Sequence, residues 1–227
     1  LRELFHVHAS LGEFDLAMHA FDSYVDIIGK GKARAQKTGQ HQDGIDDDDT
    51  AVLTGVEVVR VLCRYGDRSQ AEKAVAVGKN LQLWLGEGRP QSSAANGEQT
   101  TTANQQHAVQ LRASTLAAAY RAIGMSQAQW ARLTYDTDAR PGLQDEALKH
   151  LRRAEVQEPD NIETCFALSS LLAETRDVNA AIVSIRRILA AKPDNTSDGH
   201  DDGVKDYTRQ RKLVPLWHLL ALCLSAK

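Results

Sequence analysis

The sequence has few cysteines and no cysteine pair. Among its 227 residues only Cys63, Cys165 and Cys223 occur, far apart and each within an expected helix. This spacing argues against a small disulfide-stapled domain and against a Cys-x-x-Cys zinc or redox site. We expect reduced, buried thiols in a cytoplasmic protein.

The chain also lacks a marked charge excess and a long apolar run. Its formal net charge is −3, which gives no basic footprint for nucleic acid. No apolar run approaches the ~18 residues of a membrane span, and no signal peptide is visible. We therefore expect no nucleic-acid partner and no direct transmembrane insertion.

Motifs for catalysis and for metal binding are missing as well. Neither G-x-S-x-G nor H-E-x-x-H occurs. The acidic run from Asp46 to Asp49 lacks the spacing and the distal Glu of a calcium loop. We expect no catalytic, metal or cofactor site, and we expect that the chain is not an enzyme.

What the sequence does contain is an internal repeat with an offset of 34 residues. The matched positions are Ala147 with Ala181, Leu151 with Ile185, Arg152-Arg153 with Arg186-Arg187, and Pro159 with Pro193. A period of 34 is that of the tetratricopeptide repeat (TPR), a pair of helices that stacks into a solenoid. We expect an all-α fold, an α–α superhelix of TPR type with long polar insertions between repeats.

Side-chain spacing within the last full repeat supports two amphipathic helices. Apolar and small residues follow one another every three or four positions, which places them on one face of each helix. They are Cys165, Leu168, Ser169 and Leu172 in helix A, and Ala181, Ile185 and Ile188 in helix B. Pro159 and Pro193 close helix B of their repeats, because proline cannot continue the hydrogen-bond ladder.

A glycine precedes the small helix-B residue by five positions in three places. The pairs are Gly12 with Ala17, Gly66 with Ala71, and Gly142 with Ala147. We expect each glycine at the turn between helices A and B, with a positive φ that other residues resist.

The chain divides into repeats and insertions, and we expect it to be one TPR-array fragment over residues 1–227 that begins in mid-helix and ends after a helix A. The expected segments are 1–28 repeat, 29–50 charged insertion, 51–85 repeat, 86–104 polar insertion, 105–123 extra helix, 125–159 repeat, 160–193 repeat, 196–211 insertion, and 212–227 helix A of a truncated repeat. In the last of these, Trp217, Leu220, Ala221 and Leu224 fall at the packing positions.

Two of these segments leave alternatives open. The charged insertion 29–50 is either a solvated loop or a docking loop whose Lys30, Lys32, Arg34 and Lys37 touch anionic lipid. The segment 105–123 is either an extra helix or half of a degenerate repeat. Gly124 is expected to end or kink it, and Ser126 to open a new helix through a capping box.

Helix A of each repeat faces the groove of such a solenoid, and it supplies the candidate partner site. In the 51–85 repeat the groove positions include Val56 and Arg60, and in the 160–193 repeat they include Glu163, Phe166 and Ser170. The chaperone-adaptor type of TPR holds a peptide carboxylate with Lys and Asn at two of these places, which this chain lacks. An apolar groove suits a partner helix.

Three stretches resemble one particular family. They are Ala122-Ile123-Gly124-Met125-Ser126, then Ala131-Arg132-Leu133-Thr134 with Ala139-Arg140-Pro141, and the ending Trp217-His218-Leu219-Leu220-Ala221-Leu222-Cys223-Leu224-Ser225-Ala226. They resemble tetratricopeptide-repeat protein 7, whose fungal members are called cargo-transport (Ypp-type) or filamentation proteins. The resemblance covers residues 105–227, and the earlier repeats follow only the general pattern.

The resemblance implies a non-catalytic scaffold that recruits a phosphatidylinositol 4-kinase to the plasma membrane through a palmitoylated Efr-type anchor, with a link to endocytosis. The location it implies is cytoplasmic and peripheral at the plasma membrane. Two other functions remain open: a general TPR adaptor of a ubiquitin ligase or of transport machinery, and a regulatory domain of a larger enzyme.

Overall fold

The computed structural model describes residues 1–38, 46–64, 67–86, 111–191 and 202–226, and these residues form helices joined by short turns. The helices are α1 (Arg2–Ser10), α2 (Phe14–Thr38), α3 (Asp48–Arg64), α4 (Arg68–Trp84), α5 (Ala113–Leu133), α6 (Arg140–Gln157), α7 (Ile162–Glu174), α8 (Val178–Ala190) and α9 (Asp202–Ser225). The described part of the chain is therefore all-helical, as the sequence predicts.

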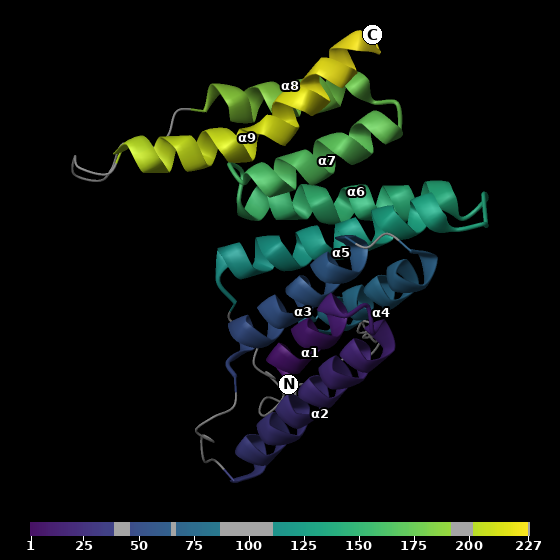
Figure 1. The fold of residues 1–227 in the computed structure, drawn as a ribbon, viewed down its shortest axis with the longest axis vertical. Coiled ribbons are helices and arrows are strands. Elements are labelled where there is room, and N and C mark those ends of the chain that lie inside the picture. The colour runs from purple at the N-terminus through teal and green to yellow at the C-terminus, as the bar shows by residue number, and fades with distance from the viewer. Residues whose placement is uncertain (39–45, 65–66, 87–110, 192–201, 227) are drawn as a thin grey trace, which may run out of the picture.

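The helices pack in chain order into an elongated stack, which rises from α2 at one end to α8 and α9 at the other (Figure 1). Consecutive helices form the pairs α1/α2, α3/α4, α5/α6 and α7/α8. The first helices of successive pairs also lie against one another, α3 on α5, α5 on α7 and α7 on α9. This order is consistent with an α–α superhelix, and it places α3, α5 and α7 side by side on one face.

Two clusters of buried side chains form the core, and α5 contributes to both. Ala122 and Ile123 belong to the cluster that joins α1 to α5. Ala128, one turn further along the same helix, belongs to the cluster that joins α5 to α9. Where the paired helices approach each other, alanine replaces a larger side chain: Ala17, Ala71, Ala147 and Ala181 are all fully buried.

The expected charged insertion 29–50 is wrong in its boundaries. Helix α2 continues to Thr38, and α3 begins at Asp48, so only the part around 39–45 lies outside the described residues. The acidic run belongs to the start of α3, where Asp47 accepts a hydrogen bond from Thr50 N at 2.9 Å. Carboxylates are favourable at a helix N-terminus because the peptide dipoles leave a partial positive charge there. Lys32 of α2 pairs with Asp48 of α3.

The expected break at Gly124 is also wrong, and with it the boundaries 105–123 and 125–159. Helix α5 runs through Gly124 without interruption, and Ser126 lies buried within it, donating a hydrogen bond to Ile123 O at 2.8 Å. A glycine costs a helix about 1 kcal/mol. Here its missing side chain lets Leu151 and the carbonyl of Ala147 approach, so tertiary packing outweighs propensity.

The end of the chain differs from expectation too. Residues 202–211, expected to be an insertion, form the first half of α9, while 196–201 lie outside the described residues. Of the four expected packing residues only Leu220 is buried, since Trp217 is 54% exposed and Leu224 is 47% exposed. The face that packs is instead Leu213, Leu216, Leu220 and Cys223.

The turn glycines divide into three cases. Gly12 has φ +78°, as expected. Gly142 lies inside the first turn of α6 with no positive φ, which corrects the expectation, because α6 begins before it. Gly66, like Pro193, lies outside the described residues, and α6 ends at Gln157, two residues before Pro159. Five positions before Ala181 the same turn conformation is adopted by Arg176, with φ +66°.

Candidate functional site

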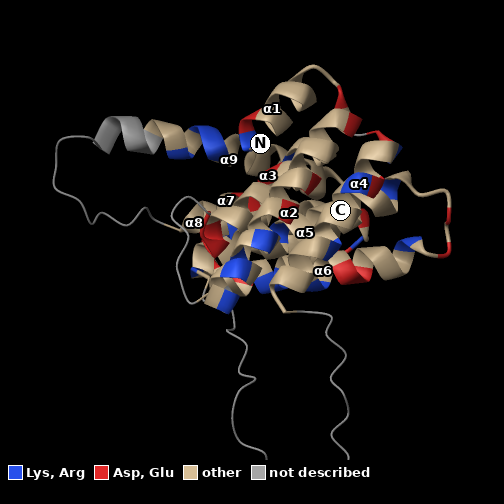
Figure 2. Cartoon of the chain, turned by 90° about the horizontal axis from the view of Figure 1, so that it is seen from below, with Lys and Arg blue, Asp and Glu red and all other residues tan. Residues whose placement is uncertain are grey.

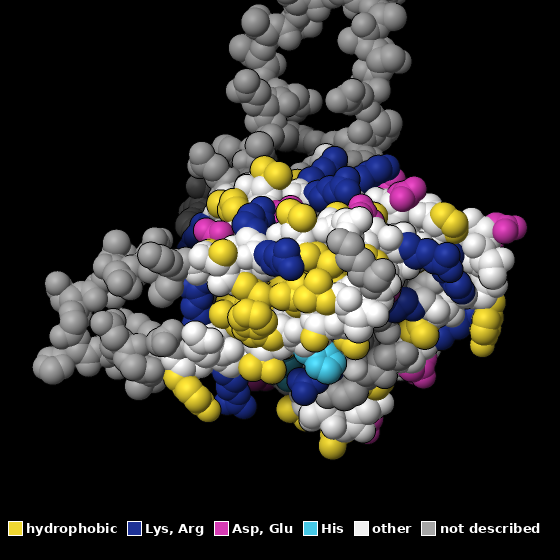
Figure 3. Space-filling view, turned by 90° about the horizontal axis from the view of Figure 1, so that it is seen from above, with side chains coloured by type: hydrophobic (Ala, Val, Ile, Leu, Met, Phe, Trp, Pro, Cys, Tyr) yellow, Lys and Arg dark blue, Asp and Glu magenta, His cyan; other side chains and the backbone are white. Residues whose placement is uncertain are grey.

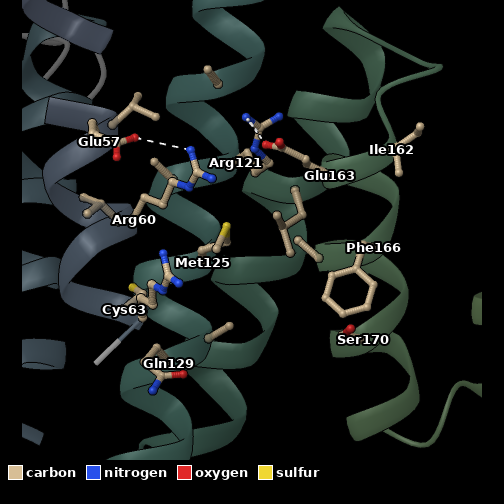
Figure 4. Close-up of a pocket in the computed structure, with 18 of the residues that line it drawn as sticks. Glu57, Arg60, Cys63, Arg121, Met125, Gln129, Ile162, Glu163, Phe166 and Ser170 are labelled. Atoms are coloured by element: carbon tan, nitrogen blue, oxygen red, sulfur yellow. Dashed lines mark hydrogen bonds and ion pairs between the residues drawn. The ribbon is translucent and has the colours of Figure 1, made fainter. Parts of the chain in front are cut away.

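An open groove of about 930 Å³ runs across α3, α5 and α7 (Figure 4). All five candidate groove residues of the sequence line it: Val56 and Arg60 from α3, and Glu163, Phe166 and Ser170 from α7. Lys212 and Pro215 of α9 close one side. The remaining sequence-selected residues do not line it: Gly12, Ala17, Ala71, Ala147, Pro159, Leu168, Ala181 and Trp217. A role of the groove in partner binding stays a prediction.

Three helices present the same spacing of side chains to this groove. Helix α3 contributes Leu53, Val56, Arg60 and Cys63, and α5 contributes Ala118, Arg121, Met125 and Ala128. Both sets advance by three, four and three residues, so each lies along one helical face. The α5 set was missed by sequence reasoning.

A small residue within α5 is the signal that could have found this set. Gly124 lies one residue before Met125 in the same way that Val59 lies before Arg60 and Ser169 before Ser170. Twelve residues separate Ser169 from Ala181, but 23 separate Gly124 from Ala147, so counting back from Ala147 gives the wrong register.

The extra residues lengthen both helices of this pair. Relative to Ser169 and Ala181 of the next pair, α5 extends four residues further past Gly124 and α6 begins four residues earlier before Ala147. Four residues are about one helical turn. The antiparallel contact is thus extended at both ends without disturbing the groove face.

The floor of the groove is apolar. Phe166 is 40% exposed at its edge, and Val59 and Ala122 are buried beneath it. Burial raises the pKa of the Cys63 thiol to about 11, which keeps it protonated and uncharged at neutral pH. Met125 adds a flexible thioether that adapts to the shape of a ligand.

Arg121 crosses the groove and ties α5 to the start of α7. Its Nη2 lies 3.0 Å from Glu163 Oε2, and its Nη1 donates to Asn161 Oδ1 at 3.0 Å and to Thr164 Oγ1 at 3.2 Å. Asn161 also caps α7 by accepting from Thr164 N at 2.9 Å. Burial lowers the pKa of Arg121, but a guanidinium stays charged. This arginine is therefore occupied within the protein.

Arg132 makes a second tie between the same helices. Its guanidinium holds the Glu174 carboxylate in a two-pronged pair, with distances of 2.7, 2.9 and 3.1 Å, and Nη1 donates to Gln129 Oε1 at 2.9 Å. Such a forked geometry fixes both side chains. Together with Arg121, Arg132 holds α5 and α7 at a fixed separation across the groove.

Other cations on the rim are not neutralised in this way. Arg60 is 66% exposed and only loosely paired, 3.5 Å from Glu57. Arg64 and Lys212 have no ion-pair partner among the residues that the structure describes. Elsewhere acidic and basic residues alternate along the helices, as the view from below shows (Figure 2). The groove rim thus has an excess of positive charge that the molecule as a whole lacks.

Comparison of the chain with protein-family models, with curated proteins and with solved structures gives no match. Across the described ranges, no group of three or more His, Cys, Asp or Glu residues is placed to hold a metal ion. Within the same ranges, every helix is too short or too polar to cross a bilayer.

Proposed function

We propose that the chain is a TPR-type solenoid that acts as a protein-binding scaffold, with the groove of α3, α5 and α7 as its partner site. The observation that carries this proposal is the shared face of the three helices: each exposes the same i, i+3, i+7 positions to one concave, apolar surface. Stacked helix pairs with such an extended concave surface bind protein segments in repeat proteins generally.

The partner that the resemblance to tetratricopeptide-repeat protein 7 favours is a phosphatidylinositol 4-kinase assembly. In this proposal the scaffold links the kinase catalytic subunit to a palmitoylated Efr-type anchor and lies at the cytoplasmic face of the plasma membrane. The support is the sequence resemblance of residues 105–227, a region that includes α5 and α7 of the groove.

The experiment is an affinity purification of the tagged full-length protein from its own cells, with and without Phe166→Asp. Phe166 lies at the groove edge and is 40% exposed, so a carboxylate there is solvated in the free protein but opposes an apolar partner. The matched control is Val183→Asp on α8 of the same pair, where the side chain is 68% exposed and outside the groove.

Co-purification of a phosphatidylinositol 4-kinase and a membrane anchor, lost with Phe166→Asp and retained with Val183→Asp, is the expected result. Recovery of a different assembly that depends on Phe166 would keep the scaffold and discard the lipid-kinase role. Partners that are indifferent to Phe166 would show that the groove is not the site.

A further inference from the structure

We propose that the occupant of the groove is an amphipathic helix of a partner protein that carries Asp or Glu beside its apolar face. This inference rests on the proposed function and specifies the chemistry of the partner. It depends on three features of the groove: which charges are already satisfied, which backbone groups a ligand would have to satisfy itself, and how wide the groove is.

The charge balance of the lining favours an acidic ligand. Its cations are Arg60, Arg64, Arg121, Arg132 and Lys212, and its carboxylates are Glu57 and Glu163. Glu163 and Glu174 occupy Arg121 and Arg132, which leaves the other three cations facing solvent with at most a loose pairing to Glu57. The chain as a whole carries −3, so this local excess is opposite in sign to the net charge. Complementary potentials select and orient a partner.

The composition of the floor favours a helix over an extended peptide. A helix satisfies its own backbone hydrogen bonds, whereas an extended segment over an apolar surface leaves N–H and C=O groups without partners. The groove wall is built from helices, whose backbone groups are used internally, and so it has no strand edge to pair with. Apolar residues at every third or fourth position would then lie on Val56, Met125 and Phe166.

The width of the groove sets the length of this helix. Packed helices lie 8–10 Å apart, so the outer two of three neighbouring helices are roughly 20 Å apart. A ligand helix that crosses α3, α5 and α7 thus needs about 13 residues at 1.5 Å each. Acidic groups near one end of such a helix would meet Arg60 and Arg64, one turn apart on α3.

The test uses two matched display libraries of 16-residue peptides panned against the 227-residue chain. Both fix apolar residues at i, i+3, i+4, i+7 and i+11. At the flanking positions one library carries Glu or Gln and the other carries Lys or Gln. The chain variant is Arg60→Glu with Arg64→Glu. Its matched control is Arg152→Glu with Arg186→Glu, two exposed arginines on α6 and α8 outside the groove.

The expected result is enrichment of the acidic library alone, at least tenfold weaker binding to the Arg60/Arg64 variant, unchanged binding to the control, and weaker binding in higher salt. Enrichment of the Lys library, of both libraries equally, or of neither would overturn the inference. Loss of partners with Phe166→Asp in the cell experiment would in that case still support the groove, which keeps the two failures distinguishable.

Discussion

At Gly124, α5 passes so close to α6 that there is no room for a side chain. A Cβ atom there would lie 2.7 Å from Leu151 Cγ and 3.0 Å from Ala147 O. Leu151 is itself fully buried, so it has no free space into which to move. Gly124→Ala should therefore lower the free energy of unfolding by about 1–3 kcal/mol, in spite of the better helix propensity of alanine.

A matched control for Gly124 is Gly142→Ala. Gly142 is helical, exposed and has nothing within 4 Å of an added Cβ. Alanine there should raise the free energy of unfolding by roughly 0.5 kcal/mol, because it reduces the entropy of the unfolded chain. Urea titrations of both variants measure the two effects. A destabilising Gly142→Ala would instead indicate the positive-φ turn that the sequence suggested.

Cys63 should make the stability of the protein depend on alkaline pH. Burial raises the pKa of its thiol to about 11 from an ordinary value of 9.0, so the folded state holds the proton more tightly than the unfolded state. The stabilisation is complete below pH 9 and is lost as pH rises through 11. Between pH 8.5 and 11 the free energy of unfolding should fall further, by on the order of 1–2 kcal/mol, in wild type than in Cys63→Ala. Parallel pH slopes in the two proteins would contradict this.

At the scale of the element, α5 makes the clearest distinction between sequence and structure. Gln127 would be the first residue of a new helix if Ser126 were its cap, and proline is well accepted there. In the continuous helix, proline at this position removes an interior hydrogen bond and costs about 3 kcal/mol or more. Circular dichroism and urea unfolding of Gln127→Pro, with Gln127→Ala as control, measure the difference. A Gln127→Pro variant of near wild-type stability would restore the two-helix interpretation.

Local patterns predicted the helix pairs but not their lengths. The spacing of Cys165, Leu168 and Leu172 predicts the buried face of α7, because that face packs against the adjacent helices in the regular way. The continuity of α5 at Gly124 depends instead on Leu151, which lies 27 residues away, and propensity carries no information on such a contact.

For the site, sequence reasoning found the groove residues of the two regular helices and missed those of the irregular one. Val56 and Phe166 follow from counting along a 34-residue period. Arg121 and Met125 do not, because the extra turns of α5 and α6 separate them from the alanine that sets the count. Pairing of the rim charges was likewise invisible, since Arg132 and Glu174 are 42 residues apart.

At the scale of the whole molecule, α5 links two cores and carries the middle of the groove. One wall, α3, belongs to the first buried cluster, and the other, α7, belongs to the second. Arg121 and Arg132 reach from α5 to α7, while Ala122 and Ile123 pack toward α3 and α4. The groove therefore exists only while both halves of the stack are folded around this helix.

This arrangement predicts that the two halves unfold together. Ile123 is fully buried in the first cluster, and Ile123→Ala should cost about 2–5 kcal/mol. Because α5 is shared, hydrogen exchange of amides in α7 and α8 should accelerate by a factor similar to that in α3 and α4. The control is Val156→Ala on α6, 76% exposed, which should change neither. Acceleration confined to α3 and α4 would mean that the halves are independent, and that the groove opens by separation of α3 from α7.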